Sequence, residues 1–220
     1  MTFHIRSASI PPGAKAVADP KTGIGAFTRM GFRANEGWAD GLHVVYLGGD
    51  RVAFTHSRKD FSQGAEQVLQ VGALALMREE PFRRWTIAYH GEAQDVADDR
   101  ILITPRKERP QGWFKPAQLD MNVRFDATAD PFYFWRGESG HFEQTGRATG
   151  TIEVGGAKWQ IDGWGLRDKS WGPRTWKPSS IGSGSGEKKR SSEPALFNVW
   201  LAATFGADLA FALTGMRDGG

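Results

Sequence analysis

The feature that most constrains the fold of this chain is the alternation of apolar and polar residues in short runs. Successive side chains of a β-strand point to opposite faces, so a period of two indicates strands with one buried face. Helical periodicity is scarce, so the chain is predicted to be all-β. Strands are expected at 41–47, 50–57, 67–78, 83–90, 99–107, 117–127, 141–154 and 157–168.

Glycine pairs at two strand junctions favour antiparallel pairing of these strands. Gly48-Gly49 and Gly155-Gly156 suit the positive φ angles of tight hairpin turns. The chain also combines 28 Gly with 9 Trp and 14 Phe, and this mixture is typical of curved sheets, in which glycine permits bends and rings fill the interior. We therefore predict an antiparallel β-barrel.

Composition excludes several classes of function. The chain has no cysteine, so disulfides, thiolate metal sites and cysteine nucleophiles are absent. The 28 Lys and Arg face 25 Asp and Glu and are mostly scattered, which gives no indication of nucleic-acid binding. The five histidines are dispersed without metal-ligand spacing, so no metal and no other cofactor is predicted.

The sequence contains no apolar run long enough for a membrane span, which needs about 20 residues. The N-terminal MTFHIRSASIPPG lacks the apolar core of a signal peptide. We expect a cytoplasmic protein, while the sequence leaves its oligomeric state open.

The chain is expected to divide near residue 140. An N-terminal β domain would occupy 1–140, and the start of a second β domain would occupy 141–220, with a flexible loop at 177–194. A hairpin follows this loop and ends at Arg217-Asp218-Gly219-Gly220 without a returning strand. We therefore expect the chain to be a fragment of a longer protein.

The aromatic segment 131–138 is expected to be a loop or an edge piece. It would lay its rings, Trp135 among them, across the mouth of the barrel. The alternative is that these rings simply fill the core, because aromatic side chains supply much buried area per residue.

The stretch from Asp162 to Arg174 is the most informative about chemistry. In an extended strand its side chains form two sets on opposite faces. One face carries Trp164, Leu166 and Asp168, and the other carries Gly163, Gly165, Arg167 and Lys169. If the first face points inward, an apolar setting raises the pKa of Asp168, and its carboxyl becomes a proton donor near neutral pH. Alternatively, Asp168 pairs with an arginine or caps the turn at Ser170.

A second polar set lies upstream. His141, Glu143, Arg147 and Glu153 are all odd-numbered and hence share one face of a strand. They form either a solvated face with weak ion pairs or a site at the cavity rim. In the second case Glu143 would orient Arg167 or Arg174, and His141 would act as a base for water.

The segment GWGLRDKSWGPR resembles the RDHSWGPR-type motif of lipocalin-like proteins related to the AttH family and to carotenoid hydratase (hydroxyneurosporene synthase). The shared residues are Asp168, Ser170, Trp171 and Gly172, with Arg174 just beyond. The upstream HFEQTGRATGTIEVGG is similar to the strand pair before the motif, so the resemblance covers about 141–217.

The resemblance implies a two-domain lipocalin-like architecture with a ligand cavity, in proteins longer than this chain. Its enzymes hydrate, cyclise or isomerise terpenoid or polyketide-like molecules. It would make Asp168 the acid that protonates a carbon–carbon double bond and would place Trp171 beside the resulting cation. Lys169 departs from the pattern, which usually has His there. Any proton relay through that His is therefore not carried over.

Two functions follow from these observations. The first is a cofactor-independent hydro-lyase or isomerase that acts on a hydrophobic small molecule, with Asp168 and Trp171 as catalytic residues. The second is a non-catalytic carrier of a hydrophobic ligand. The residues expected to line the ligand site are Trp164, Arg167, Arg174, His141, Glu143 and Trp135.

Overall fold

The computed structural model describes residues 13–33, 36–61, 68–136, 139–172, 197–205 and 209–217. These residues form antiparallel strands and two short 3-10 helices. The strands are β1 (Gly13–Asp19), β2 (Ile24–Arg33), β3 (Trp38–Tyr46), β4 (Val52–Asp60), β5 (Val68–Val71), β6 (Leu74–Glu80), β7 (Arg84–Val96), β8 (Lys115–Ala127), β9 (Phe132–Arg136), β10 (Ser139–Val154), β11 (Ala157–Trp171), β12 (Phe197–Phe205) and β13 (Leu209–Arg217). The predicted all-β class is confirmed.

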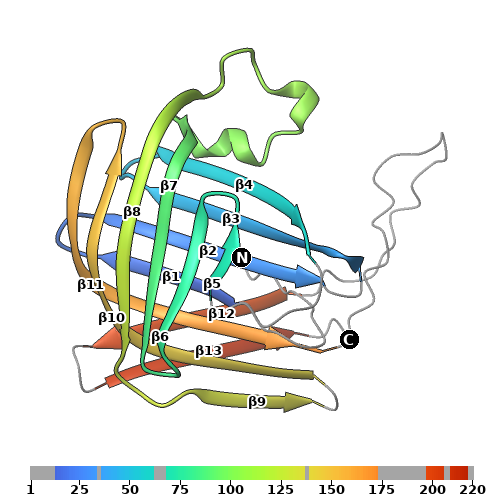
Figure 1. The fold of residues 1–220 in the computed structure, drawn as a ribbon, viewed down its shortest axis with the longest axis vertical. Helices are drawn as coiled ribbons and strands as arrows, with labels where there is room; N and C mark the ends of the chain where they lie inside the picture. Colours follow the sequence, from blue (N-terminus) through green and yellow to red (C-terminus); the bar gives the residue numbers. More distant parts are fainter. Residues whose placement is uncertain are drawn as a thin grey trace.

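Eight strands of the main sheet close into a barrel-like ring (Figure 1). Its order is β4-β3-β2-β1-β11-β10-β8-β7, and β7 pairs again with β4. Strands β6 and β5 extend the sheet from β7, and β9 pairs with the edge of β10. Strands β12 and β13 form a separate two-stranded sheet.

Two elements differ from the sequence-based expectation. The predicted strand at 99–107 is instead a pair of 3-10 helices, Asp99–Leu102 and Arg106–Glu108. Asp98 caps the first helix by accepting a hydrogen bond from the Arg100 amide, and Pro105 precedes the second, where a proline has no amide hydrogen for a sheet. The segment at 131–138 contains the edge strand β9, one of the two forms that were expected.

Strands β1 and β2 were not predicted, although both belong to the ring. β1 is rich in alanine and short, and β2 has buried residues on both faces over much of its length, so neither displays clean alternation. Their pairing with β11 and β3 places them at the centre of the sheet order.

The ring interior is filled by one apolar core. The core gathers one face of each ring strand, because paired residues on neighbouring antiparallel strands share a face. Among its largest fully buried side chains are Phe32, Phe125, Met30, Leu76, Ile87, Leu119, Ile152 and Val45. The expected aromatic filling of the interior is therefore accompanied by many aliphatic side chains.

Strands β10 and β11 form a long hairpin whose turn is Gly155-Gly156, with φ of 57° and 87° as the turn prediction required. Residue 140 lies within β10, and β10 pairs with β8 while β11 pairs with β1. The sheet therefore continues across the position at which a domain boundary was expected. The expected flexible loop at 177–194 lies outside the described residues.

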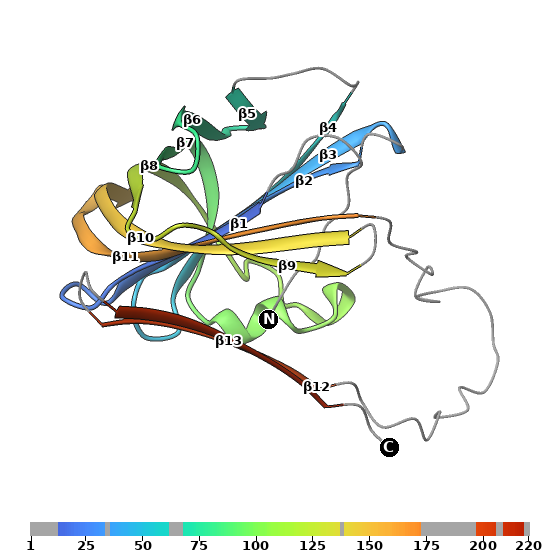
Figure 2. The ribbon, with the colours of Figure 1, turned by 90° about the horizontal axis from the view of Figure 1, so that it is seen from below.

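The β10–β11 pair has a second layer on its outer side. Figure 2 shows the β12–β13 hairpin on the side of β10 and β11 that faces away from β6 and β7. One face of this pair is thus turned to the ring core and the other toward the hairpin. Within the described part of the chain, no helix is sufficiently long and apolar to cross a membrane.

Candidate functional site

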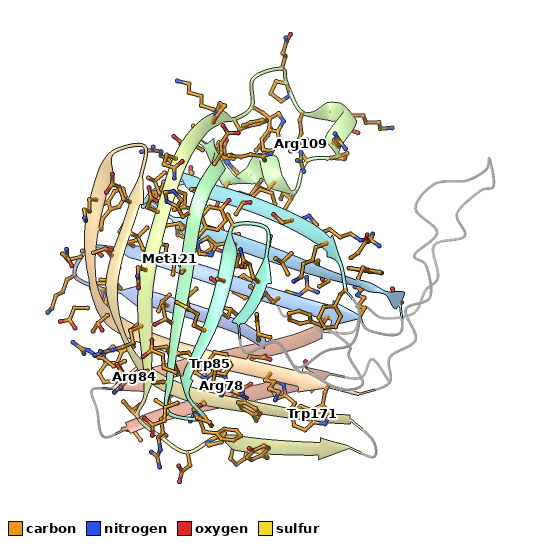
Figure 3. The ribbon with its side chains drawn as sticks, in the orientation of Figure 1. Arg78, Arg84, Trp85, Arg109, Met121 and Trp171 are labelled. Atoms are coloured by element: carbon orange, nitrogen blue, oxygen red, sulfur yellow. The ribbon has the colours of Figure 1, made fainter. Side chains whose placement is uncertain are left out.

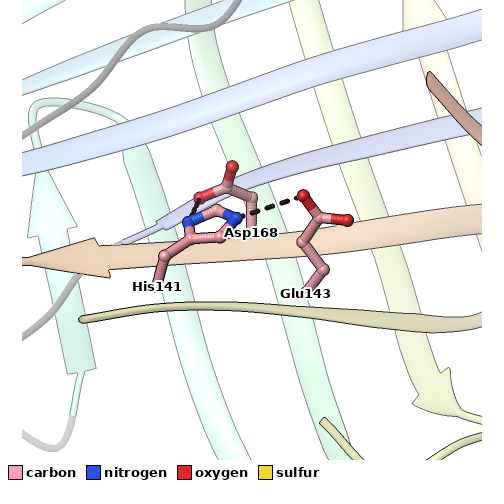
Figure 4. A group of neighbouring side chains, drawn as sticks. All are labelled: His141, Glu143 and Asp168. Carbon is pink, nitrogen blue, oxygen red and sulfur yellow. Dashed lines mark hydrogen bonds and ion pairs between the residues drawn. The ribbon is translucent and has the colours of Figure 1, made fainter. Parts of the chain in front are cut away.

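Three ionisable side chains meet on the outer face of β10 and β11 (Figure 4). His141 Nε2 lies 3.1 Å from Glu143 Oε1, and His141 Nδ1 lies 3.6 Å from Asp168 Oδ1. The imidazole therefore stands between two carboxylates. Glu143 and Asp168 are buried, with 3% and 7% of their surface exposed, and His141 is half-buried.

The register of the hairpin brings this cluster together. Glu143 pairs directly with Asp168 across β10 and β11, and His141 pairs with Ser170 one step along the same face. His141 and Glu143 are two positions apart in the strand, so both point to the same side of β10. The two carboxylates come from different strands, and only strand pairing places them side by side.

Burial and neighbouring charges shift the pKa values of Asp168 and His141. Burial raises the pKa of Asp168 to about 6; the nearby His141 charge opposes this rise and the Glu143 carboxylate adds to it. Burial alone would lower the pKa of His141, but the hydrogen bond to Glu143 and the charges of both carboxylates outweigh it and raise that pKa. Asp168 is thus partly protonated near neutral pH.

The same three side chains offer ligand atoms that all lie within 4.8 Å of one another. One imidazole and two carboxylates form a donor set that suits several divalent metals. No metal was predicted from the sequence, because its five histidines are dispersed without metal-ligand spacing. The tertiary structure brings His141 together with carboxylates from two strands. In the present arrangement both ring nitrogens face carboxylate oxygens.

A buried ion pair extends the polar character of this outer face. Arg29 on β2 donates a hydrogen bond from Nη1 to Asp40 Oδ2 at 2.9 Å, and both residues are buried. Ala14 on β1 pairs with both Asp168 and Arg29, which puts the two side chains in one row across three strands. Arg29 was not predicted as a site residue, because the sequence of β2 has no clean alternation and was not identified as a strand. An arginine among the apolar residues of that segment was the available signal.

Arg167 and Trp171 do not join the cluster. Gln144 pairs with Arg167 across β10 and β11, and Gln144 shares its face with core residues such as Ile152. Arg167 therefore points into the ring, away from Glu143, which consequently does not orient it. Trp171, expected to stand beside the substrate cation, packs over Gly140 and near Phe142 on the core side of the hairpin, whereas Asp168 lies on the other face.

The inward direction proposed for Asp168 is likewise corrected. The two sets of alternating residues are those predicted, but the set that faces the ring core is the one with Ile161 and Arg167. Asp168 is nevertheless withdrawn from water, on the outer face of β11. Burial of the carboxyl, the physical condition for a proton donor, is met on a different face.

The remaining expected ligand residues lie apart from the cluster or outside the described residues. Trp164 shares the Asp168 face but is four residues away, where the Arg147 guanidinium lies 5.0 Å from its ring. Trp135 belongs to β9, where its backbone pairs with Gly140, and its side chain is outside the description. Arg174 lies outside the described residues altogether.

Comparison with known proteins yields one finding. No curated protein and no solved structure matches the chain. A family model described as a domain of unknown function, DUF7064, matches residues 15–220. Since this match spans nearly the whole chain, the protein belongs to the DUF7064 family.

Proposed function

We propose that this protein transfers protons to an unsaturated, apolar small molecule of the terpenoid or polyketide-like class, as a cofactor-independent hydro-lyase or isomerase. The observation that carries the proposal is the buried cluster of Asp168, His141 and Glu143 on the outer face of the β10–β11 hairpin. We also propose kinship with AttH-like proteins and carotenoid hydratase, on the motif around Asp168. A cytoplasmic location stays a prediction from the N-terminal sequence.

The cluster supports a balanced hydration cycle. Neutral Asp168 donates its proton to one carbon of a double bond, which leaves a carbocation on the other carbon. Water adds to this cation, and His141 removes a proton from that water. The proton then passes from His141 Nδ1 to Asp168 Oδ1, 3.6 Å away, which restores the acid. The sum is addition of one water to one alkene.

Glu143 positions the histidine in this cycle. Its hydrogen bond to His141 Nε2 holds the ring in place while Nδ1 faces Asp168. The carboxylate also stabilises the imidazolium that forms when His141 takes up a proton. Isomerisation needs only the first transfer, followed by removal of a different proton from the cation by His141.

The position of the cluster changes the expected ligand site. The ring interior is occupied by a packed apolar core, and Asp168 faces the opposite direction. We therefore propose that the substrate binds on the outer face of β10 and β11, on the side of the β12–β13 hairpin. Leu166, which is buried on the same face two residues from Asp168, would supply apolar contact there.

Incubation of the full chain with a panel of acyclic isoprenoid alkenes in heavy-oxygen water tests the proposal. Hydration would place labelled oxygen in the product, and a parallel reaction in deuterium oxide would reveal isomerisation by deuterium uptake. We expect Asp168→Asn to lower turnover by about 100-fold or more, the usual contribution of a general acid, while ligand affinity is kept. The control is Asp162→Asn, an exposed carboxylate on the same strand.

Three outcomes contradict this mechanism. Equal turnover by Asp168→Asn would remove the acid, and recovery of bound but unlabelled alkenes would favour the carrier. Loss of activity in a chelator, restored by a divalent metal, would mean that the cluster holds a cation instead of a shared proton.

A further inference from the structure

The face of β11 opposite Asp168 carries a buried cation with few polar partners. Arg167 is 6% exposed, and the hydrogen bond that its guanidinium makes runs from Nη1 to Gln144 Oε1 at 3.3 Å. Gln144 is fixed in this orientation, because its Nε2 donates to the carbonyl oxygens of Phe82 at 2.7 Å and Ala129 at 2.9 Å. The guanidinium thus faces one neutral acceptor and several aromatic rings.

Aromatic rings surround this guanidinium. Its central carbon lies 4.6 Å from the Trp85 ring centroid, 4.7 Å from that of Phe142 and 5.9 Å from that of Phe82. Ring faces attract a cation, but they carry no net charge to neutralise it. The guanidinium therefore keeps its positive charge and several N–H donors in an apolar setting.

A second cation lies beside the first. Lys169 is two residues further along the same face, and its Nζ lies 5.5 Å from the Phe142 centroid and 5.6 Å from the Trp171 centroid. Burial, together with the positive charges of Arg167 and Arg78, lowers the pKa of Lys169 to about 8. Arg78 comes from β6, where it pairs with Trp85, and the two are neighbours in Figure 3.

Arg167 and Lys169 have no acidic counterpart in the described part of the chain. No Asp or Glu there raises the pKa of Arg167 or Lys169; Tyr133 is the group that raises the pKa of Arg167. Like charges gathered away from water are unfavourable unless an anion joins them. This arrangement therefore has the charge and the donors to hold an anion.

The turn between β6 and β7 gives this cluster an edge at the surface. Phe82 is 44% exposed, and Arg78 is exposed as well. Phe82 has a φ of 59°, the one positive φ of a non-glycine residue in the described chain, and bulky side chains rarely adopt this conformation. The strained residue supplies both a ring and the carbonyl that orients Gln144, so the strain is located where the cluster is built.

We propose that Arg167 and Lys169, with Arg78 at the rim, bind the carboxylate of an amphipathic small molecule whose apolar part packs on Phe82 and Trp171, the rings of this cluster that reach the surface. A guanidinium pairs with a carboxylate through two parallel hydrogen bonds, and the ammonium adds a second charge. The surrounding rings favour a ligand with an apolar remainder over a small inorganic anion. This site is independent of the proposed proton transfer, because Asp168 lies on the other face of β11.

Binding of dodecanoate to the full chain tests the proposal, with dodecanol and inorganic phosphate as comparison probes. Tryptophan fluorescence reports binding, since Trp85 and Trp171 border the cluster, and calorimetry gives the affinity. We expect dodecanoate to bind at least about tenfold more tightly than either comparison probe, as expected for charge-assisted hydrogen bonds in an apolar setting.

Charge-removing variants assign the site. Arg167→Gln and Lys169→Gln should each weaken dodecanoate binding about tenfold and leave dodecanol binding unchanged. Lys158→Gln, an exposed lysine on the same strand, is the matched control. Lys169 is less buried than Arg167, so its variant keeps the test valid if Arg167→Gln does not fold.

The result that overturns the proposal is equally definite. Equal affinity for dodecanoate and dodecanol would show that no cation reads the head group. Phosphate binding as tight as dodecanoate binding would show that the apolar part of the ligand does not contribute to affinity. Unchanged dodecanoate affinity in folded Lys169→Gln and Arg167→Gln would place the binding elsewhere.

Discussion

The buried ionisable residues on the two faces of β11 differ in charge and in surroundings. Asp168 has a raised pKa and faces a histidine and a carboxylate, whereas Arg167 and Lys169 have lowered pKa values and face aromatic rings. In each case burial is the largest cause and disfavours the charged form. Because the pKa of Asp168 is higher in the folded protein than in the unfolded chain, its contribution to stability is present below pH 4. This contribution is lost as pH rises through about 6.

His43, inside the barrel-like ring, gives the opposite pH dependence of stability. The imidazole of His43 is fully buried, and its Nδ1 lies 2.7 Å from Thr28 Oγ1. Its Nε2 has no hydrogen-bond partner among the described residues. A second proton would therefore be buried without an acceptor, and burial lowers the pKa of His43 to about 4. Because the folded pKa is below the ordinary value of 6.5, stability is intact above pH 6.5 and is lost as pH falls through about 4.

We predict that His43→Gln removes this loss. Between pH 7 and pH 4 the wild type should lose up to about 3 kcal/mol of unfolding free energy through His43, from the size of its pKa shift. The variant, which does not titrate, should lose correspondingly less, as measured by urea unfolding at a series of pH values. His90→Gln, at an exposed histidine, should retain the wild-type loss. Parallel curves for wild type and His43→Gln would contradict the prediction.

Strand β11 depends on a glycine where β1 approaches it. A Cβ added to Gly163 would lie 2.1 Å from the carbonyl oxygen of Ala18 and 2.8 Å from the Cα of Asp19. Both are backbone atoms of β1, so neither can move without a change in strand pairing.

Gly163→Ala is therefore expected to destabilise the protein strongly. Overpacking against backbone should cost about 3 kcal/mol or more, since no flexible side chain can give way. Urea unfolding gives the free energy, and Gln160→Ala, an exposed change on the same strand, is the control. If Gly163→Ala were as stable as this control, the close approach of β1 and β11 would be refuted.

The ring as a whole has one short seam. Strands β4 and β7 pair only from Val52 to Phe54, opposite Gln94 to Val96, whereas β10 and β11 pair over nearly their full length. Arg51 reinforces the seam from outside with two hydrogen bonds of 2.8 Å to the carboxylate of Asp95. Because few backbone hydrogen bonds hold this seam, the free energy of local opening is lowest there.

Hydrogen exchange should reveal this opening. We expect amides at the β4–β7 seam to exchange faster than those between β10 and β11, and Arg51→Ala to accelerate exchange at the seam by a factor of about 2 to 5. Exchange at the β10–β11 hairpin should not change in this variant. Uniform protection around the ring would mean that the short seam is not its weakest point.

The sequence alone was sufficient for the fold class and for part of the candidate site. Alternation predicted the all-β class, the glycine pair at 155–156 predicted the long hairpin, and the odd and even residues of β10 and β11 were sorted correctly into faces. These features are local, because they depend on strand periodicity and turn chemistry. Strands β1 and β2 lack a clear local signal, and Arg29 was missed with them.

Only the tertiary structure decided which face of β11 meets the core. Both faces are buried between Gly165 and Asp168, so burial by itself does not distinguish them. Periodicity states that Arg167 and Asp168 point in opposite directions, but the inward choice depends on what packs against each face. The register of β10 against β11 also placed His141 and Glu143 beside Asp168, a contact between residues far apart in the chain that no local pattern encodes.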